Sequence, residues 1–198
     1  MRREVTSPIA AIVLAAGASH RMGTNKMLLE LDGAPLVRRA CRRALAAGLA
    51  PVIVVLGHEV ERVQNALSGL SCRVTVNKEY ARPMSGSLHA GIECLPAASH
   101  AAVVMLADMV NVTAQMLRKL RIAARANGAP LIASRYATTL APPILFRKAL
   151  FGELLATKGE GAGKAVVEKY QAEALFIDWP AAALIDVDTP QDFARLSR

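Results

Sequence analysis

The chain has 198 residues and a formal net charge of +8, with 53% hydrophobic and only 4% aromatic residues. This length predicts a single compact domain over residues 1–198, and its short apolar runs exclude disorder, coiled coil and a membrane-spanning helix of roughly 18 residues. The positive charge favours an anionic ligand, but the basic cluster at 38–43 has no aromatic residues to stack bases, so we expect a solvated helix face and no nucleic-acid partner.

Apolar runs alternate with helical patterns along the chain. Continuous apolar runs at 9–16, 51–57 and 101–107 predict strands buried on both faces. Helical spacing predicts helices at 35–47 and 60–67, from Ser85, between Thr113 and Asn127, and after Thr189. Shorter strands are predicted at 72–76, 130–134, 143–146, 174–177 and 184–187. The pattern predicts an α/β fold with a three-layer, doubly wound, mostly parallel Rossmann-like sheet, whose ligands bind beyond the carboxyl ends of the strands.

The three cysteines, Cys41, Cys72 and Cys94, are far apart in the sequence. They form no C-x-x-C pair and give no zinc spacing with the few histidines. We interpret them as small buried hydrophobic residues in a reducing compartment. The first apolar run also lacks the cleavage site of a secretory signal. We therefore expect a cytoplasmic protein that does not act at a membrane.

The loop after the first predicted strand carries residues suited to binding phosphates. Its small residues at 15–19 let backbone N–H groups approach an anion closely. Arg21 adds a planar fork of donors and Lys26 a point charge. The loop matches neither the G-x-G-x-x-G fingerprint of dinucleotide-binding proteins nor a Walker loop. The alternative is an ordinary strand-to-helix turn with exposed basic residues.

Three further segments offer polar groups near the expected edge of the sheet. Asp108 follows the third apolar strand, where Mg²⁺ with a bound polyphosphate would lie, although it could equally start a turn. Asp188 is either a second metal ligand or a residue that supports the Thr189 cap. The polar stretch 77–91 runs into the helix from Ser85, whose N-terminus suits a nucleoside or its phosphates.

The segment LAAGASHRMGTNK at 14–26 resembles the signature L-A-A-G-x-S-x-R-M-G-x-x-K of the nucleotidyltransferases that act on the molybdenum cofactor. These are the MobA-like group, with the molybdopterin cytidylyltransferases of the MocA type as the nearest branch. The similarity extends over nearly the whole chain, to 77–91, 106–110, 141–146, 159–164 and 186–192. Two departures are Ala107 and Val110 around Asp108, where the family usually has Gly and Pro, and Ala141-Pro142, where it usually has Gly or His before Pro-Val-Leu-Phe.

The resemblance implies a role for each matching residue. Lys26, Arg21 and Asp108 would be catalytic, and Asp108 and Asp188 would hold Mg²⁺. The nucleotide would be bound by Leu14, Ala15, Ala16, Gly17, Ser19, Arg21, Lys26, Arg82, Ser85, Gly86 and Ser87, with the stretch from Arg82 to Ser87 reading the base. The pterin side would be met by Pro142, Pro143, Gly161 and Lys164. Ala16 stands where guanylyl-transferring relatives tend to have a second glycine, which favours CTP over GTP.

The leading hypothesis is a Mg²⁺-dependent nucleotidyltransferase that moves CMP from CTP onto the phosphate of molybdopterin and releases pyrophosphate. The product would pass to a molybdoenzyme. One alternative keeps the chemistry but takes another phosphorylated acceptor, such as a sugar phosphate. A second alternative is a non-catalytic protein that binds and delivers the molybdenum cofactor. Lys26, Arg21 and Asp108 together argue against the second, since a carrier needs no metal-bound triphosphate.

Overall fold

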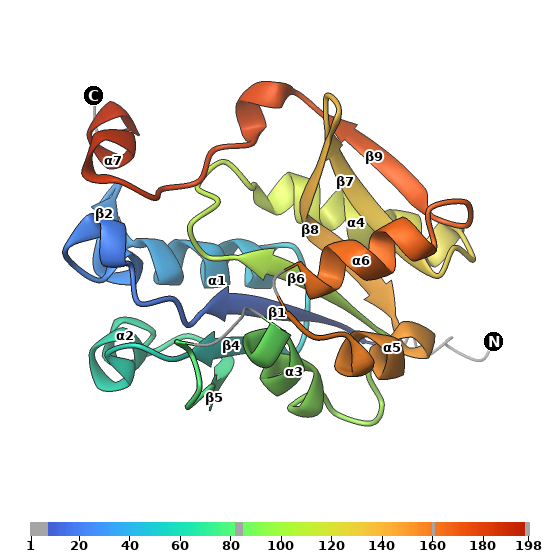
Figure 1. Ribbon diagram of the computed structural model, residues 1–198, viewed down its shortest axis with the longest axis horizontal. Coiled ribbons are helices and arrows are strands. Elements are labelled where there is room, and N and C mark those ends of the chain that lie inside the picture. The colour runs from blue at the N-terminus through green and yellow to red at the C-terminus, as the bar shows by residue number, and fades with distance from the viewer. Residues whose placement is uncertain (1–7, 82–84, 160, 197–198) are drawn as a thin grey trace.

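The computed structural model describes residues 8–81, 85–159 and 161–196 (Figure 1). Its centre is a seven-stranded sheet in the order β5-β4-β1-β6-β8-β7-β9. The first four strands in that order are parallel: β5 (Cys72–Val76), β4 (Val52–Leu56), β1 (Ile9–Ala15) and β6 (Ala101–Leu106). β8 (Thr139–Arg147) is antiparallel to β6 and to β7 (Leu131–Tyr136), and β9 (Leu175–Trp179) is parallel to β7. The predicted doubly wound, mostly parallel α/β fold is confirmed.

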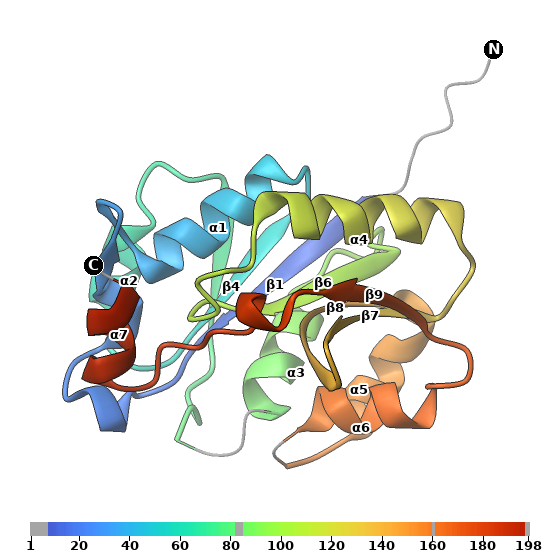
Figure 2. The same ribbon diagram turned by 90° about the horizontal axis from the view of Figure 1, so that it is seen from above.

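Helices cover both faces of the sheet, which gives three layers (Figure 2). One face carries α1 (Leu36–Ala46), α2 (Val60–Ala66) and α4 (Ala114–Ala126), and the other carries α3 (Ser85–Glu93), α5 (Phe151–Ala156) and α6 (Ala162–Lys169). Alternate residues of β1 enter the two apolar layers, because successive side chains of a strand point to opposite faces. Burial on both faces explains why the strand is a continuous apolar run.

The carboxyl ends of β1 and β6 lie side by side at the point where the strand order reverses. From β1 the chain continues to β4 and β5 on one side of it and then crosses to β6 on the other. Residues 9–14 of β1 pair with 101–106 of β6, and the Ala107 N–H donates to the Leu14 carbonyl at 3.1 Å. The loop after β1 and the loop carrying Asp108 are therefore neighbours, at the position where open α/β sheets bind ligands.

The last helix, α7 (Pro190–Leu196), lies beside the short hairpin of β2 (Glu30–Leu31) and β3 (Ala34–Pro35) (Figures 1 and 2). Phe193 and Leu196 of this helix pack against a small apolar cluster that is separate from the two main layers. The buried members of the cluster are Met22, Leu31, Leu36, Val110 and Val187. This cluster holds the C-terminal segment against the loop that follows β1.

The predicted strand at 184–187 is wrong. Its only ladder contact is an isolated antiparallel bridge between Met109 and Asp186. The place beside β6 in the sheet is taken by β8, which pairs with β6 along 101–104, so the segment instead runs across the end of β6. The β2–β3 hairpin and the helices α5 and α6 were not predicted, because they are too short to produce a clear periodic pattern.

The basic cluster at 38–43 is more than a solvated helix face. The guanidinium of Arg38 donates to the Ala66 and Ser68 carbonyls at 2.9 and 2.8 Å. Arg39 donates to the Leu31 carbonyl at 2.6 Å and Arg43 to the Val110 carbonyl at 2.6 Å. These arginines tie α1 to the carbonyls of neighbouring segments, so they have a structural use. Within the described ranges no helix has the length and hydrophobicity needed to cross a bilayer.

Candidate active site

The loop after β1 is held in shape by Ser19. This residue has a left-handed backbone with φ of 56°, and its carbonyl accepts from the Met22 N–H at 2.9 Å. Its hydroxyl accepts from the Lys26 N–H at 3.1 Å, which closes the loop. Gly23, with φ of 69°, makes the second reversal, a conformation that glycine adopts without steric cost. The loop is thus a pair of short turns that ends at Lys26.

Asn25, a buried residue, anchors the end of this loop. Its side-chain oxygen accepts from the Met27 N–H at 3.0 Å, and its amide donates to the His58 carbonyl at 3.3 Å. A side-chain cap of this kind fixes where a helical turn starts. The contacts of Asn25 therefore fix the backbone position from which the Lys26 side chain extends.

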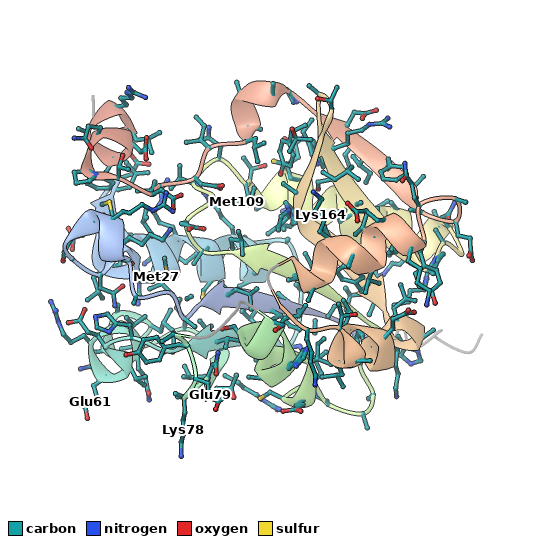
Figure 3. The ribbon with its side chains drawn as sticks, in the orientation of Figure 1. Met27, Glu61, Lys78, Glu79, Met109 and Lys164 are labelled. Atoms are coloured by element: carbon teal, nitrogen blue, oxygen red, sulfur yellow. The ribbon has the colours of Figure 1, made fainter. Side chains whose placement is uncertain are left out.

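Four side chains predicted to act at the site converge at the carboxyl ends of β1 and β6. The ammonium of Lys26 forms an ion pair with Asp108 and a second one, at 2.9 Å, with Asp188. The guanidinium of Arg21 reaches the other oxygen of Asp188 at 2.8 Å. The side chains of Lys26 and Asp108 are 13% and 15% exposed, whereas Arg21 is 71% exposed. Met27 and Met109, the residues after Lys26 and Asp108, mark the two loops in Figure 3.

Backbone contacts bring Asp188 to this place. The Val187 N–H donates to the Asp108 carbonyl at 3.3 Å, next to the bridge between Met109 and Asp186. Thr189 and Asp192 cap α7 reciprocally: the Asp192 N–H donates to the Thr189 hydroxyl at 3.2 Å, and the Asp192 carboxylate accepts from the Thr189 N–H at 2.8 Å. The Asp188 N–H also donates to the Asp192 carboxylate at 3.3 Å, so the backbone of Asp188 supports the cap. Its side chain pairs with Lys26 and Arg21, and its role as a metal ligand stays a prediction.

The charges of the site perturb one another. Burial lowers the pKa of Lys26, but the charge and hydrogen bond of Asp108 and those of Asp188 outweigh burial, so its pKa is raised and it stays protonated. The hydrogen bond from Lys26 holds the pKa of Asp188 below its usual value. Desolvation of its carboxyl group, and then the charges of Asp108 and Asp188, raise the pKa of Asp186. The site is thus acidic, with one buried cation at its centre.

The carboxylates of Asp108 and Asp188 fit a divalent cation that also binds phosphate. Both carboxylates contact the ammonium of Lys26, so oxygens from two loops stabilise a positive charge at this position. Mg²⁺ is usually held by one or two carboxylates together with substrate phosphates. In the part of the chain that the structure describes, no group of three or more His, Cys, Asp or Glu residues is arranged to hold a metal.

The predicted nucleotide residues of α3 have intramolecular partners. The Ser85 hydroxyl accepts from the Gly159 N–H at 3.2 Å, and the Ser87 hydroxyl accepts from the Asn77 amide at 3.0 Å. A Cβ on Gly86 would lie 3.3 Å from that same amide. Both hydroxyls act as acceptors in these bonds, so each O–H can still donate to a ligand. Arg82, predicted to read the base, lies outside the described residues.

The alanines and the glycine at the end of β1 and just after it differ in accessibility. Ala15 and Ala16 are buried, and the Ala16 carbonyl accepts from the His58 N–H at 3.3 Å. Gly17 is exposed, and no atom lies within 4 Å of the place where its Cβ would be. Open space at this backbone is what a phosphate-binding loop requires.

A cavity of about 280 Å³ joins part of the predicted nucleotide site to part of the predicted acceptor site. It is lined by Leu14 and Ser85 from the first set and by Pro142, Gly161 and Lys164 from the second. Lys164, on α6, is labelled in Figure 3. The other lining residues are apolar or glycine: Leu88, Val104, Leu106, Leu140, Ala141, Ile144, Phe146, Ala162, Gly163 and Val167.

Pro143 is the one predicted acceptor residue that does not line this cavity. It is buried in β8, and its carbonyl accepts from the Ser134 hydroxyl at 2.7 Å. The neighbouring Pro142 carbonyl accepts from the Tyr136 hydroxyl at 2.9 Å. Both bonds tie β8 to β7 across an irregular stretch of their pairing.

Sequence reasoning assigned no role in the site to Asn25, Asn77 or Asp186. The two asparagines position the residues that were predicted, one by anchoring the loop before Lys26 and the other by binding Ser87. Asn25 could have been found, since an asparagine before a short turn is a common cap. Asp186 could not have been found, because its place near Asp108 depends on the bridge between residues 186 and 109, which are far apart in the sequence.

Comparison with known proteins agrees with this architecture. Residues 11–174 match the MobA-like NTP transferase domain. Among solved structures, Rv0371c from Mycobacterium tuberculosis H37Rv is 27% identical with a TM-score of 0.86, and the match covers 96% of this chain and 97% of that one. Rv0371c has also been solved as a complex with manganese. A nucleotidyl transferase from Methanothermobacter is 25% identical with a TM-score of 0.82, covering 96% of both chains.

A curated relative covers less of the chain. The bifunctional protein GlmU of Anaeromyxobacter sp. (strain K) is 42% identical over 86 residues, which is 42% of this chain and 18% of GlmU. The chain thus spans less than a fifth of that relative's length. The family match extends over most of the chain, in agreement with the fold and with the convergence of Lys26, Asp108 and Asp188. The chain belongs to the MobA-like NTP transferase domain family.

Proposed function

We propose that the protein transfers CMP from CTP onto the phosphate of molybdopterin and releases pyrophosphate. The observation that carries the nucleotidyl-transfer part is the convergence of Lys26, Arg21, Asp108 and Asp188 beside the open loop at Gly17. The choice of CTP rests on Ala16 in place of a second glycine, and the choice of molybdopterin rests on the sequence resemblance to the MocA type.

In this proposal the loop after β1 receives the triphosphate through its backbone N–H groups. Lys26 and Arg21 place positive charge against the phosphate oxygens, and Lys26 stabilises the charge on the α-phosphate as the acceptor oxygen attacks in line. The acceptor phosphate is already ionised near neutral pH, so the reaction needs no general base. Catalysis is then positioning and charge stabilisation.

Asp108 and Asp188 would hold the divalent cation, which we take to be Mg²⁺. When bound, this cation would neutralise charge on the triphosphate and on the leaving pyrophosphate. The same two carboxylates hold the ammonium of Lys26, which in this proposal would act on the phosphates. Rv0371c, which has a similar fold, has been solved as a complex with manganese, which supports the use of a divalent metal.

The apolar cavity favours a second candidate, in which the same transfer is made to a different phosphorylated acceptor. Only Ser85 and Lys164 among its lining residues have polar side chains, so the cavity offers few partners to a polar ring. A pterin ring carries several donors and acceptors, and burying them without partners is costly. An acceptor with a less polar body would fill these walls better.

Product analysis with radiolabelled nucleotides separates the candidates. The protein is incubated with Mg²⁺ and either CTP or GTP, together with molybdopterin, a sugar phosphate or an alcohol phosphate. The proposal expects pyrophosphate release and a labelled dinucleotide from CTP with molybdopterin. Labelled product with another acceptor, and none with molybdopterin, would show that molybdopterin is not the acceptor. Labelled product from GTP, and none from CTP, would show that CTP is not the nucleotide. Tight molybdopterin binding with no nucleotide binding would identify a carrier and contradict nucleotidyl transfer.

A further inference from the structure

The charged residues of α1 and α4, which lie next to each other in one helical layer, are all positive (Figure 2). α1 has four arginines, and α4 has three arginines and a lysine. None of the chain's 16 Asp and Glu residues lies on either helix. Among the ion pairs of the described residues, Arg39 is the only one of these cations with an acidic partner, Asp32. Most of this positive charge is therefore not paired with an acid of the protein itself.

On the outer side of α4, exposed cations surround an exposed apolar side chain. Ile122 is 56% exposed, and among the described large hydrophobic residues only Val76 is exposed as well. Lys119 and Arg125 stand three residues before and after Ile122, and Arg118 stands four residues before it. Residues at these spacings are neighbours on the surface of a helix, and all three cations are exposed. This side of α4 thus combines positive charge with one apolar contact point.

Contacts with neighbouring elements hold two of these cations in place. The guanidinium of Arg118 donates to the carbonyl of Ala46, the last residue of α1, at 2.9 Å. The ammonium of Lys119 lies over the ring of Trp179 on β9, 5.1 Å from its centroid. Arg42, exposed on α1 one turn before Ala46, extends the charge onto that helix. Side chains that are already held lose less conformational entropy when a partner binds.

The exposed apolar residue distinguishes among anionic partners. A phosphate backbone would contact the cations but would not use Ile122, and α1 and α4 carry no aromatic residue on which a base could stack. A helix that lies in a membrane surface needs a whole apolar face, but the apolar side of α4 is buried against the sheet. An acidic polypeptide offers both carboxylates and apolar side chains.

We propose that this surface, the α1–α4 face, binds an acidic segment of a partner protein. The face consists of Arg42, Arg118, Lys119, Ile122 and Arg125. Asp or Glu carboxylates of the partner pair with the four cations, and the arginines can hold them through two hydrogen bonds each. An apolar side chain of the partner packs on Ile122. Complementary charge steers the encounter and sets the orientation, while the apolar contact adds affinity.

The test is binding of two fluorescein-labelled peptides to the full chain, measured by fluorescence anisotropy at about 0.15 M salt, where long-range attraction is screened. Both peptides are longer than α4, which has 13 residues. One consists of Glu with Leu at every fourth position, and the other of Glu alone. The Glu-Leu peptide should bind several-fold more tightly. Its unlabelled form should change the emission of Trp179, the chain's only tryptophan, through Lys119. No nucleotide is present, so the result is independent of the proposed function.

Variants locate the binding surface. Lys119→Glu with Arg125→Glu should weaken binding of the Glu-Leu peptide about tenfold or more. The matched control is Arg73→Glu with Lys78→Glu, which makes the same change of charge at two exposed residues on and just after β5, at the other edge of the sheet. It should retain most of the affinity. Ile122→Ser should remove the preference for the Glu-Leu peptide over the Glu peptide.

Several results would overturn the proposal. These are no peptide binding by the wild type, an equal loss in the two double variants, a preference for the Glu-Leu peptide that survives Ile122→Ser, and peptide binding that leaves the emission of Trp179 unchanged. Duplex RNA and phosphatidylserine vesicles are titrated in parallel. Tighter binding of either than of the Glu-Leu peptide, lost in Lys119→Glu with Arg125→Glu, would assign the face to nucleic acid or to a membrane.

Discussion

The ammonium of Lys26 is shared by carboxylates from two loops, and this arrangement explains why the residue is both buried and charged. Asp108 and Asp188 replace the water that burial removes, which is the condition for keeping a charge inside a protein. The segment at 14–26 predicted the lysine and its loop from small residues and basic charge alone. Its pairing with Asp188 could not be predicted, since it depends on where the C-terminal segment crosses the sheet.

Replacing Lys26 should abolish most of the activity. We expect Lys26→Ala to lower the rate of pyrophosphate release about 10²-fold or more, by analogy with the loss of one preorganised donor at a reacting anion. Lys78→Ala is the matched control, because Lys78 is an exposed lysine whose side chain projects away from the molecule (Figure 3). Steady-state kinetics with saturating nucleotide makes the comparison. Near-normal turnover of Lys26→Ala would remove this residue from the mechanism.

Asp186 and Asp188 should affect stability in opposite directions. The pKa of Asp188 is lowered by folding, so its charge stabilises the fold above the ordinary value of 3.8 and this contribution is lost as the pH falls below it. The pKa of Asp186 is raised by folding, so its charge destabilises the fold at neutral pH and protonation relieves the cost as the pH falls toward 4.

Urea unfolding at pH 7 checks both signs. Asp188→Asn should lower the free energy of unfolding by about 1 kcal/mol or less, since this carboxylate is partly exposed to solvent. Asp186→Asn should raise it. Both differences should shrink on repeating the measurement at about pH 3.5. The same sign for both variants at pH 7 would mean that the charges of the site are not arranged as the structure has them.

At the scale of elements, the close approach of α3 to the sheet depends on Gly91. A Cβ built there would lie 2.5 Å from Ile12 Cγ2 and 3.1 Å from Val55 Cγ2, closer than side chains pack. Periodicity predicted that a helix starts at Ser85, but not which residue touches β1 and β4. A single sequence does not reveal which helix residue meets the sheet, whereas the apolar strands themselves were clear from their composition.

Gly91→Ala should therefore destabilise the protein although alanine favours helix. We expect a loss of about 1–3 kcal/mol, as for other substitutions that overfill a packed core. Gly152→Ala, on α5, has open space around the new methyl group and should raise stability by about 0.5–1 kcal/mol. Thermal unfolding of the two variants compares them directly. A stabilising Gly91→Ala would show that α3 does not lie as close to β1 as described.

At the scale of the whole molecule, the layers and the parallel strands followed from the sequence because each strand is a buried apolar run. The antiparallel insertion of β8 beside β6 did not, since a short apolar segment at 143–146 carries no sign of its direction or partner. The crossing segment at 184–187 was mistaken for a strand for the same reason. That residues 1–198 form a single domain stays a prediction.

The most direct test concerns the claim that Asp108 couples a divalent cation to the triphosphate. Calorimetric titration with CTP, with and without Mg²⁺, is compared among wild type, Asp108→Asn and the control Asp178→Asn, whose exposed carboxylate pairs with Arg135 on β7, away from the site. Mg²⁺ should strengthen CTP binding roughly tenfold or more in the wild type and the control, and have little effect in Asp108→Asn. An equal Mg²⁺ enhancement in all three proteins would contradict the account.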